Sequence, residues 1–151
     1  MSLIDEQKSI FFKFLSIFSV VRIYNILIIV LAQYLTSIFI LSDKKLFDVI
    51  FDFNLFLLIL CSSLSIASGY IINNFYDQKK DIINKPIKSK IDDVVKKSTK
   101  LYFYFILNFV VLFFASIISL RAVIFFSVYI FFLWFYSHKL KRLLFIGNLF
   151  Y

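Results

Sequence analysis

The chain has 151 residues, of which 62% are hydrophobic, and its mean hydropathy is +0.90. A soluble domain this apolar would have too little polar surface to stay in solution. The net charge of +8 is compatible with nucleic-acid binding, but on such an apolar background a lipid membrane is the better partner. The single cysteine, Cys61, excludes a disulfide framework and a thiolate metal cluster within the chain.

Four segments are long and apolar enough to cross a bilayer, which requires about 20 residues of helix. They are residues 20–41, 53–76, 101–120 and 122–138. We divide the last two at a tight turn near Leu120–Ala122, because one long helix would place Arg121 at mid-membrane. Apolar residues 10–19 predict an interfacial helix before the first span. The sequence therefore predicts an all-α, polytopic transmembrane helix bundle, with residues 1–151 in a single domain.

Basic residues are distributed unequally over the connections. Residues 77–100 contain eight lysines, whereas residues 42–52 carry two lysines against three aspartates. Cytoplasmic connections are the ones rich in lysine and arginine. We therefore expect an integral membrane protein, in a bacterium of the inner membrane, whose N-terminus, 77–100 loop and 138–142 end face the cytoplasm.

Three oxygen-bearing side chains follow one another at intervals of four residues, namely Asn73, Asp77 and Asp81. On a helix this spacing places them along one face. Carboxylates at the C-terminal end of a helix oppose its dipole and need compensating cations. One interpretation is a solvated collar paired with Lys79 and Lys80. The other is a Mg²⁺ site, because Mg²⁺ takes one or two carboxylates together with phosphate oxygens and waters.

Residues 73–86, NNFYDQKKDIINKP, resemble the first aspartate-rich motif of the UbiA-type membrane prenyltransferases, N-x-x-x-D-x-x-x-D followed by N-[RK]-P. Residues 134–149, WFYSHKLKRLLFIGNL, are similar to the family's Tyr-Ser, Leu-Lys-Arg and Gly-Asn signature. Residues 21–25, VRIYN, are similar to the arginine and asparagine that open the family's first helix. The three matches occur in the family's order.

The resemblance implies a transferase that moves the isoprenyl group of a prenyl diphosphate to a lipid-soluble or aromatic acceptor, with Mg²⁺ as cofactor. By this match Asp77 and Asp81 would bind the metal and be catalytic. The residues expected to bind the diphosphate are Arg22, Asn73, Tyr136 and Lys141. The other partners would be the acceptor and the bilayer, with no nucleic acid. The motifs look closest to the branch that prenylates geranylgeranylglyceryl phosphate.

Several of these residues also have purely structural explanations. Arg22 lies near the start of a span, from which its side chain can extend to the membrane interface. Lys141 is typical of the basic residues that flank a span on the cytoplasmic side, and Tyr136 is typical of the aromatic residues found at the membrane interface. Tyr70 and Tyr76 are candidates to stabilise an allylic cation because they lie beside the motif. The small residues Ser65, Ser68 and Gly69 predict close helix packing rather than catalysis.

The sequence departs from the family pattern in its acidic residues. After Asp81 the remaining acids are Asp92 and Asp93, which are adjacent and cannot share a helix face. A second aspartate-rich motif is therefore missing. The family has about twice as many helices, and the fifth apolar segment, from residue 143, is cut short.

We therefore expect the N-terminal half of such an enzyme, which carries its first diphosphate site but does not catalyse the transfer alone. Two alternatives remain open. One is an inactive fragment without any function. The other is a small four-helix membrane transport or structural protein. Transport would need a polar path through the bilayer, for which Asn25, Gln33 and Asn108 are the candidates.

Overall fold

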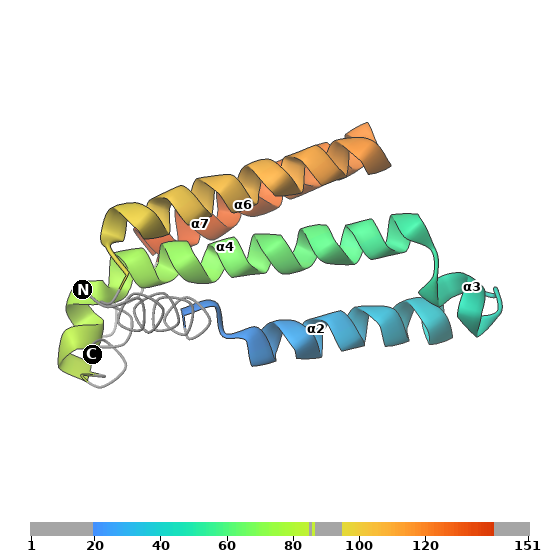
Figure 1. Cartoon of the computed structure of the whole chain (residues 1–151), viewed down its shortest axis with the longest axis horizontal. Coiled ribbons are helices and arrows are strands. Elements are labelled where there is room, and N and C mark those ends of the chain that lie inside the picture. Colours follow the sequence, from blue (N-terminus) through green and yellow to red (C-terminus); the bar gives the residue numbers. More distant parts are fainter. Residues whose placement is uncertain (1–19, 85, 87–94, 141–151) are drawn as a thin grey trace, which may run out of the picture.

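The computed structural model describes residues 20–84, 86 and 95–140, except for the side chains of residues 79, 80 and 140, and it is helical in all its regular elements (Figure 1). In chain order the elements are α2 (Ile23–Thr36), η1 (Ser37–Leu41), α3 (Leu46–Ile50), α4 (Phe53–Asn84), α6 (Lys97–Ile118), α7 (Leu120–Phe135) and η2 (Tyr136–Leu140). The elements η1 and η2 are π-helical turns that continue α2 and α7. Within the described residues, four helices are long and apolar enough to cross a membrane, which confirms the predicted all-α bundle.

Two helix ends differ from the expected spans. Helix α4 continues to Asn84, past the expected end at residue 76, so that Asn73, Asp77 and Asp81 lie on one uninterrupted helix. The break between α6 and α7 falls at Ser119, one residue before the predicted turn. Ser119 is extended, and its hydroxyl accepts a hydrogen bond of 3.1 Å from the backbone N–H of Ala122. This serine is an N-cap that fixes the start of α7, a signal that the sequence interpretation overlooked.

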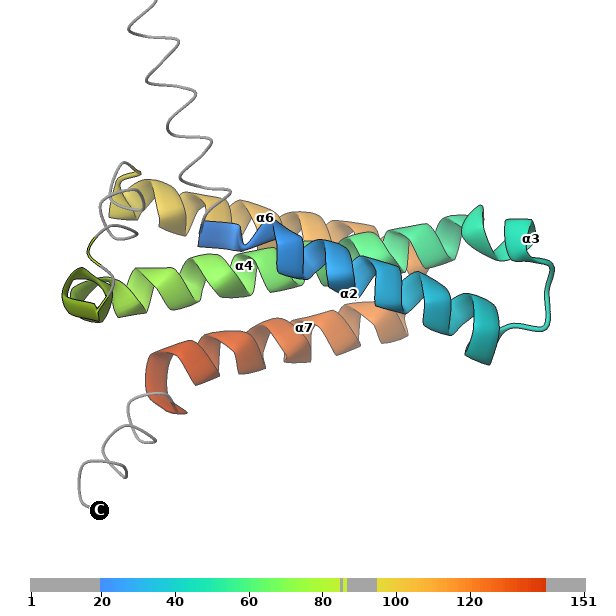
Figure 2. The ribbon, with the colours of Figure 1, turned by 90° about the horizontal axis from the view of Figure 1, so that it is seen from below.

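Helix α4 is the centre of the bundle. It packs most extensively against α6 and also contacts α2 and α7, as Figures 1 and 2 both show. Several of its buried residues are small: Ser65 and Ser68 are fully buried, and a Cβ on Gly69 would lie 3.1 Å from Cδ1 of Leu133 in α7. Small residues let helix backbones approach closely in a membrane. The predicted packing role of these residues is confirmed.

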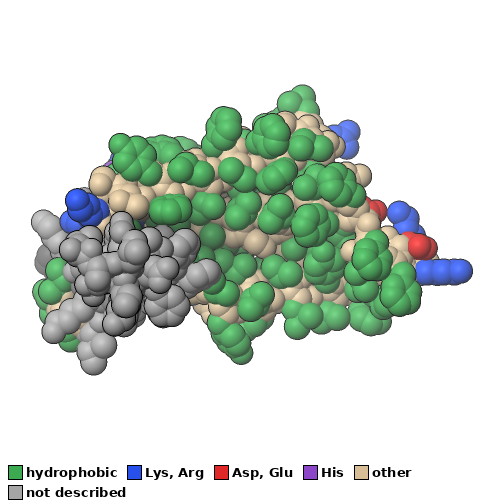
Figure 3. Space-filling model, in the orientation of Figure 1, with side chains coloured by type: hydrophobic (Ala, Val, Ile, Leu, Met, Phe, Trp, Pro, Cys, Tyr) green, Lys and Arg blue, Asp and Glu red, His purple; other side chains and the backbone are tan. Residues whose placement is uncertain are grey.

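The outer surface of the bundle is strongly apolar. Figure 3 shows one face that is almost covered by hydrophobic side chains, with charged side chains gathered near the two ends of the long axis. Large side chains stand far out of the bundle, among them Phe39, Phe51 and Phe109, each more than 70% exposed. Water disfavours such a surface, whereas lipid tails accommodate it. The fold is therefore consistent with burial of its middle in a bilayer.

Polar side chains within the spans connect neighbouring helices. Examples are the hydrogen bonds from Asn25 Nδ2 to the Tyr70 hydroxyl oxygen at 3.2 Å, from Ser62 Oγ to Gln33 Oε1 at 2.8 Å, and from Ser68 Oγ to Asn108 Oδ1 at 2.8 Å. The first two join α2 to α4, and the third joins α4 to α6. Such bonds hold membrane helices together. Asn25, Gln33 and Asn108 thus have a packing role, which weakens the argument that they line a polar transport path.

Several expectations concern residues outside the described part of the chain. They are the interfacial helix at residues 10–19, the acids Asp92 and Asp93, the diphosphate contact of Lys141, and the apolar segment from residue 143.

Candidate active site at one end of the bundle

The described parts of the three sequence motifs lie at one end of the bundle. The start of α2, the end of α4, the start of α6 and the turn η2 lie at this end in both ribbon views (Figures 1 and 2). Two long-range ring contacts support this placement: Arg22 lies over Tyr70 of α4, and Tyr76 of α4 lies against His138 of η2. The fold therefore brings together segments from three well-separated parts of the sequence.

The carboxylate face of α4 contains Asn73, Asp77 and Asp81, all of them partly buried. Because α4 is continuous here, neighbouring members of this set lie one turn apart, with Cβ atoms about 5–6 Å from each other. Carboxylate and amide oxygens are hard ligands of the kind that Mg²⁺ prefers. The arrangement that the spacing predicted is present. The cationic partners of the alternative collar, Lys79 and Lys80, have side chains outside the described part.

The donor set suits a metal that also binds a phosphate. Within the described residues no group of three or more His, Cys, Asp or Glu side chains converges on one point. Two carboxylates cannot complete the octahedral shell of Mg²⁺, but they match its usual protein ligands when phosphate oxygens and waters complete the shell. The residues present therefore fit a Mg²⁺ ion that is bound together with a diphosphate.

Arg22 is held at the start of α2 in an unusual conformation. Its φ of 52° and ψ of 56° lie in the left-handed region, where a residue with a Cβ is strained. Its guanidinium Cζ lies 5.5 Å from the centre of the Tyr70 ring, a distance typical of a cation–π contact. Tyr70 is in turn fixed by the hydrogen bond from Asn25. Sequence reasoning placed Tyr70 near the motif but missed that it orients Arg22.

An aromatic cluster closes the same end of the bundle. His138 stacks on Trp134 with ring centres 5.3 Å apart, and its ring meets Tyr76 at 5.1 Å. Its Nδ1 is buried, and it has no hydrogen-bond partner among the described residues. Tyr136, a predicted diphosphate contact, lies on the same turn and is 48% exposed. The π-helical turn is a feature often found at functional sites. The sequence interpretation had assigned no role to His138.

Lys100 is buried beside the carboxylate face. This lysine in the first turn of α6 is only 4% exposed, and its Nζ donates a hydrogen bond of 2.9 Å to Asn74 Oδ1. The sequence interpretation counted it among the eight lysines of the 77–100 loop and did not predict its burial. Helix periodicity could have indicated that Lys100 is buried, because it precedes buried Tyr104 by four residues and buried Asn108 by eight, which places all three on one face of α6.

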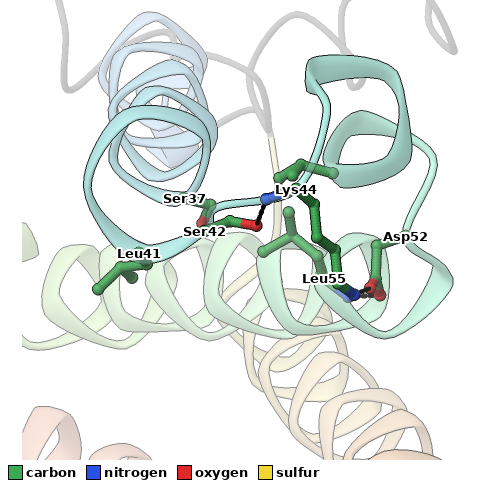
Figure 4. Close-up of a pocket in the computed structure, with 7 residues that line it drawn as sticks. Ser37, Leu41, Ser42, Lys44, Asp52 and Leu55 are labelled. Carbon is green, nitrogen blue, oxygen red and sulfur yellow. Dashed lines mark hydrogen bonds and ion pairs between the residues drawn. The ribbon is translucent and has the colours of Figure 1, made fainter.

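The opposite end of the bundle carries an open pocket between η1 and the start of α4 (Figure 4). Lys44 Nζ lies 3.8 Å from Asp52 Oδ2 there, and the backbone N–H of Lys44 donates to Ser42 Oγ at 3.2 Å. Asp52 Oδ1 also accepts hydrogen bonds from the backbone N–H groups of Asn54 and Leu55, at 2.9 and 3.1 Å. Asp52 therefore caps the N-terminus of α4, so the polar contacts at this end are explained by helix capping.

Comparison with known proteins supports the resemblance found in the sequence. Residues 30–151 match the UbiA prenyltransferase family. A stretch of 95 residues is 36% identical to digeranylgeranylglyceryl phosphate synthase of Thermococcus gammatolerans, covering 63% of this chain and 34% of that protein. The chain thus spans about a third of the length of this relative. No solved structure matches the chain. Because the family match covers most of the sequence, the chain belongs to the UbiA prenyltransferase family.

Proposed function

We propose that the end of α4 forms a diphosphate-binding site for isoprenyl transfer, in which Asp77 and Asp81 hold Mg²⁺. The observation that carries the proposal is the pair of partly buried carboxylates one turn apart on an uninterrupted helix. Membership of a prenyltransferase family supports it. When bound, Mg²⁺ would supply positive charge to a diphosphate whose negative charge grows as its bond to carbon breaks.

The other residues at this end take supporting parts. Arg22, oriented by Tyr70, offers a fixed guanidinium for phosphate oxygens, and planar guanidinium groups suit that task. Asn73 adds an amide on the metal side of α4. Tyr136 and Lys141 complete the proposed diphosphate contacts. The apolar helices beside the site would hold the prenyl tail, which cannot be solvated by water.

The reaction that we propose is an alkyl transfer. The bond between C1 of the prenyl chain and the diphosphate oxygen breaks, and the electron pair leaves with the diphosphate. The hydroxyl oxygen of the acceptor then forms a bond to C1, and the proton of that hydroxyl passes to water. We propose geranylgeranylglyceryl phosphate as the acceptor, since a relative is named for the digeranylgeranylglyceryl phosphate that it makes. The lysine-rich 77–100 loop supports a cytoplasmic location for the site.

The decisive test is binding of geranylgeranyl diphosphate to the purified chain in neutral detergent, with and without Mg²⁺. Asp77→Asn and Asp81→Asn should each weaken Mg²⁺-dependent binding at least about tenfold, because each removes a charged ligand. Asp48→Asn is a matched control, since Asp48 is exposed on α3 at the other end. If both substitutions at the α4 face leave binding unchanged, the solvated-collar interpretation is correct.

Turnover is a separate question, and we propose that residues 1–151 bind the diphosphate without transferring the prenyl group. The resemblance implies two aspartate-rich motifs, and only the first occurs in this sequence. One missing electrostatic contact can lower a rate by about 100- to 1000-fold. Pyrophosphate release with Mg²⁺ and the acceptor measures this. Robust release that Asp77→Asn abolishes would show that these residues suffice for catalysis, and would leave the metal-site proposal standing.

A further inference from the structure

Lys100 differs from the neighbouring lysines in the exposure of its side chain to solvent. Lys96 and Lys97 are exposed, as expected of lysines that flank a membrane span, whereas Lys100 is 4% exposed and donates to Asn74. A flanking lysine ordinarily extends its ammonium group into water. The fold instead keeps this positive charge between α4 and α6.

Burial at this place has two electrostatic costs for a lysine. An ammonium group loses its hydration on burial, and this loss has to be offset by polar or negatively charged neighbours. Lys100 also lies in the first turn of α6, where the partial positive charge of the helix N-terminus opposes a cation. A negative charge nearby would offset both costs.

The carboxylate face of α4 supplies that negative charge. Asn74, the hydrogen-bond partner of Lys100, precedes Asp77 by three residues on the same continuous helix. Residues three apart on a helix are neighbours, so the ammonium lies within about 10 Å of the Asp77 carboxylate. At an effective dielectric constant of about 20 to 40, a fixed charge at that distance changes the affinity for a divalent cation by about tenfold or more.

We propose that Lys100 is a specificity-determining residue of this site, whose charge makes Mg²⁺ binding at Asp77 and Asp81 depend on an accompanying diphosphate. The ammonium repels a bare divalent cation but attracts a phosphate anion, so it favours the metal–diphosphate complex over the metal alone. The inference rests on the proposed function, because it requires a metal at the two carboxylates. It adds a residue that the sequence motifs do not contain.

The test measures metal binding directly. Mn²⁺, which has a free-ion electron paramagnetic resonance signal, is titrated into the purified chain in neutral detergent, with and without inorganic pyrophosphate. Lys100→Met should bind Mn²⁺ about tenfold more tightly than wild type without pyrophosphate, and pyrophosphate should enhance its binding less. Lys97→Met is the matched control, because Lys97 is exposed in the same turn and its charge is screened.

A second variant separates charge from hydrogen bonding. Lys100→Gln removes the charge but keeps a donor for Asn74, so it should behave like Lys100→Met. If Lys100→Gln binds Mn²⁺ like wild type, Lys100 is only a structural clamp and the inference is wrong. An unchanged Mn²⁺ affinity in Lys100→Met, with binding still lost in Asp77→Asn, overturns the role of Lys100 but not the metal site. Wild-type binding that is insensitive to Asp77→Asn, or absent even with pyrophosphate, overturns both.

Discussion

Tyr70 provides a sensitive test of the candidate site, because it links α4 to the strained start of α2. Its ring lies 5.5 Å from Arg22 Cζ, and its hydroxyl oxygen accepts a hydrogen bond from Asn25. Tyr70→Phe removes only the hydrogen bond, whereas Tyr70→Leu removes the ring as well. The two substitutions therefore separate two ways of holding Arg22 in place.

The size of each effect follows from the contacts. An interhelical hydrogen bond in a membrane contributes about 0.6 kcal/mol on average. Because Arg22 is exposed, its cation–π contact falls at the lower end of the usual range, at about 0.5–1 kcal/mol. With about 1.4 kcal/mol for each factor of ten, Tyr70→Phe should weaken diphosphate binding about threefold, and Tyr70→Leu about six- to fifteen-fold.

The assay is equilibrium binding of geranylgeranyl diphosphate with Mg²⁺, measured by calorimetry in neutral detergent, so that it does not depend on turnover. Each Tyr70 variant is made in the wild-type chain and in an Arg22→Gln background. If Tyr70 acts by orienting Arg22, its loss should have little further effect once the guanidinium is gone. Equal weakening by Tyr70→Leu in both backgrounds would show that Tyr70 acts on the ligand or the fold directly, and would refute this reasoning.

Two further predictions concern topology and packing. In a Cys61→Ser background, a cysteine introduced at Lys44 should react with an impermeant thiol reagent in intact cells, while one at Lys97 should be protected; the reverse pattern would overturn the proposed orientation. Gly69→Ala should be nearly neutral, because its Cβ would meet only the movable end of Leu133 and alanine favours the helix. Gly69→Leu should lower stability in detergent by about 1–3 kcal/mol through overpacking, and unchanged thermal unfolding would contradict this packing.

Local sequence features predicted the membrane helices and the carboxylate face. Segment length and hydropathy indicate the spans because every backbone polar group in lipid must be bonded within the chain, which favours helices. The spacing of Asp77 and Asp81 was sufficient to place them together, since helix geometry alone determines it. The exact break at Ser119 was missed, because the turn was placed around Arg121, which is the more conspicuous polar residue in this apolar stretch.

Contacts between helices were not predictable in the same way. The sequence shows that Lys100 shares a face with buried residues of α6, but not that this face meets Asn74 of α4. Likewise nothing local to Arg22 indicates that Tyr70 lies beneath its guanidinium. Such pairs depend on which faces pack together, and helix periodicity leaves that choice open. His138 was missed for the same reason, because its ring contact with α4 depends on the path of α7.

Helix α4 couples packing within the membrane to the arrangement of the candidate site. Gly69 lets α7 approach α4 closely, and the same approach carries the following turn η2 to the polar end of α4, where His138 meets Tyr76. The hydrogen bond from Ser68 to α6 likewise holds the helix whose first turn contains Lys100. Site residues act only when their neighbours fix their positions to within a fraction of an ångström or so. The small residues in the middle of α4 are therefore part of the reason why its polar end can form a binding site, although they lie about one to three turns before the residues of that site.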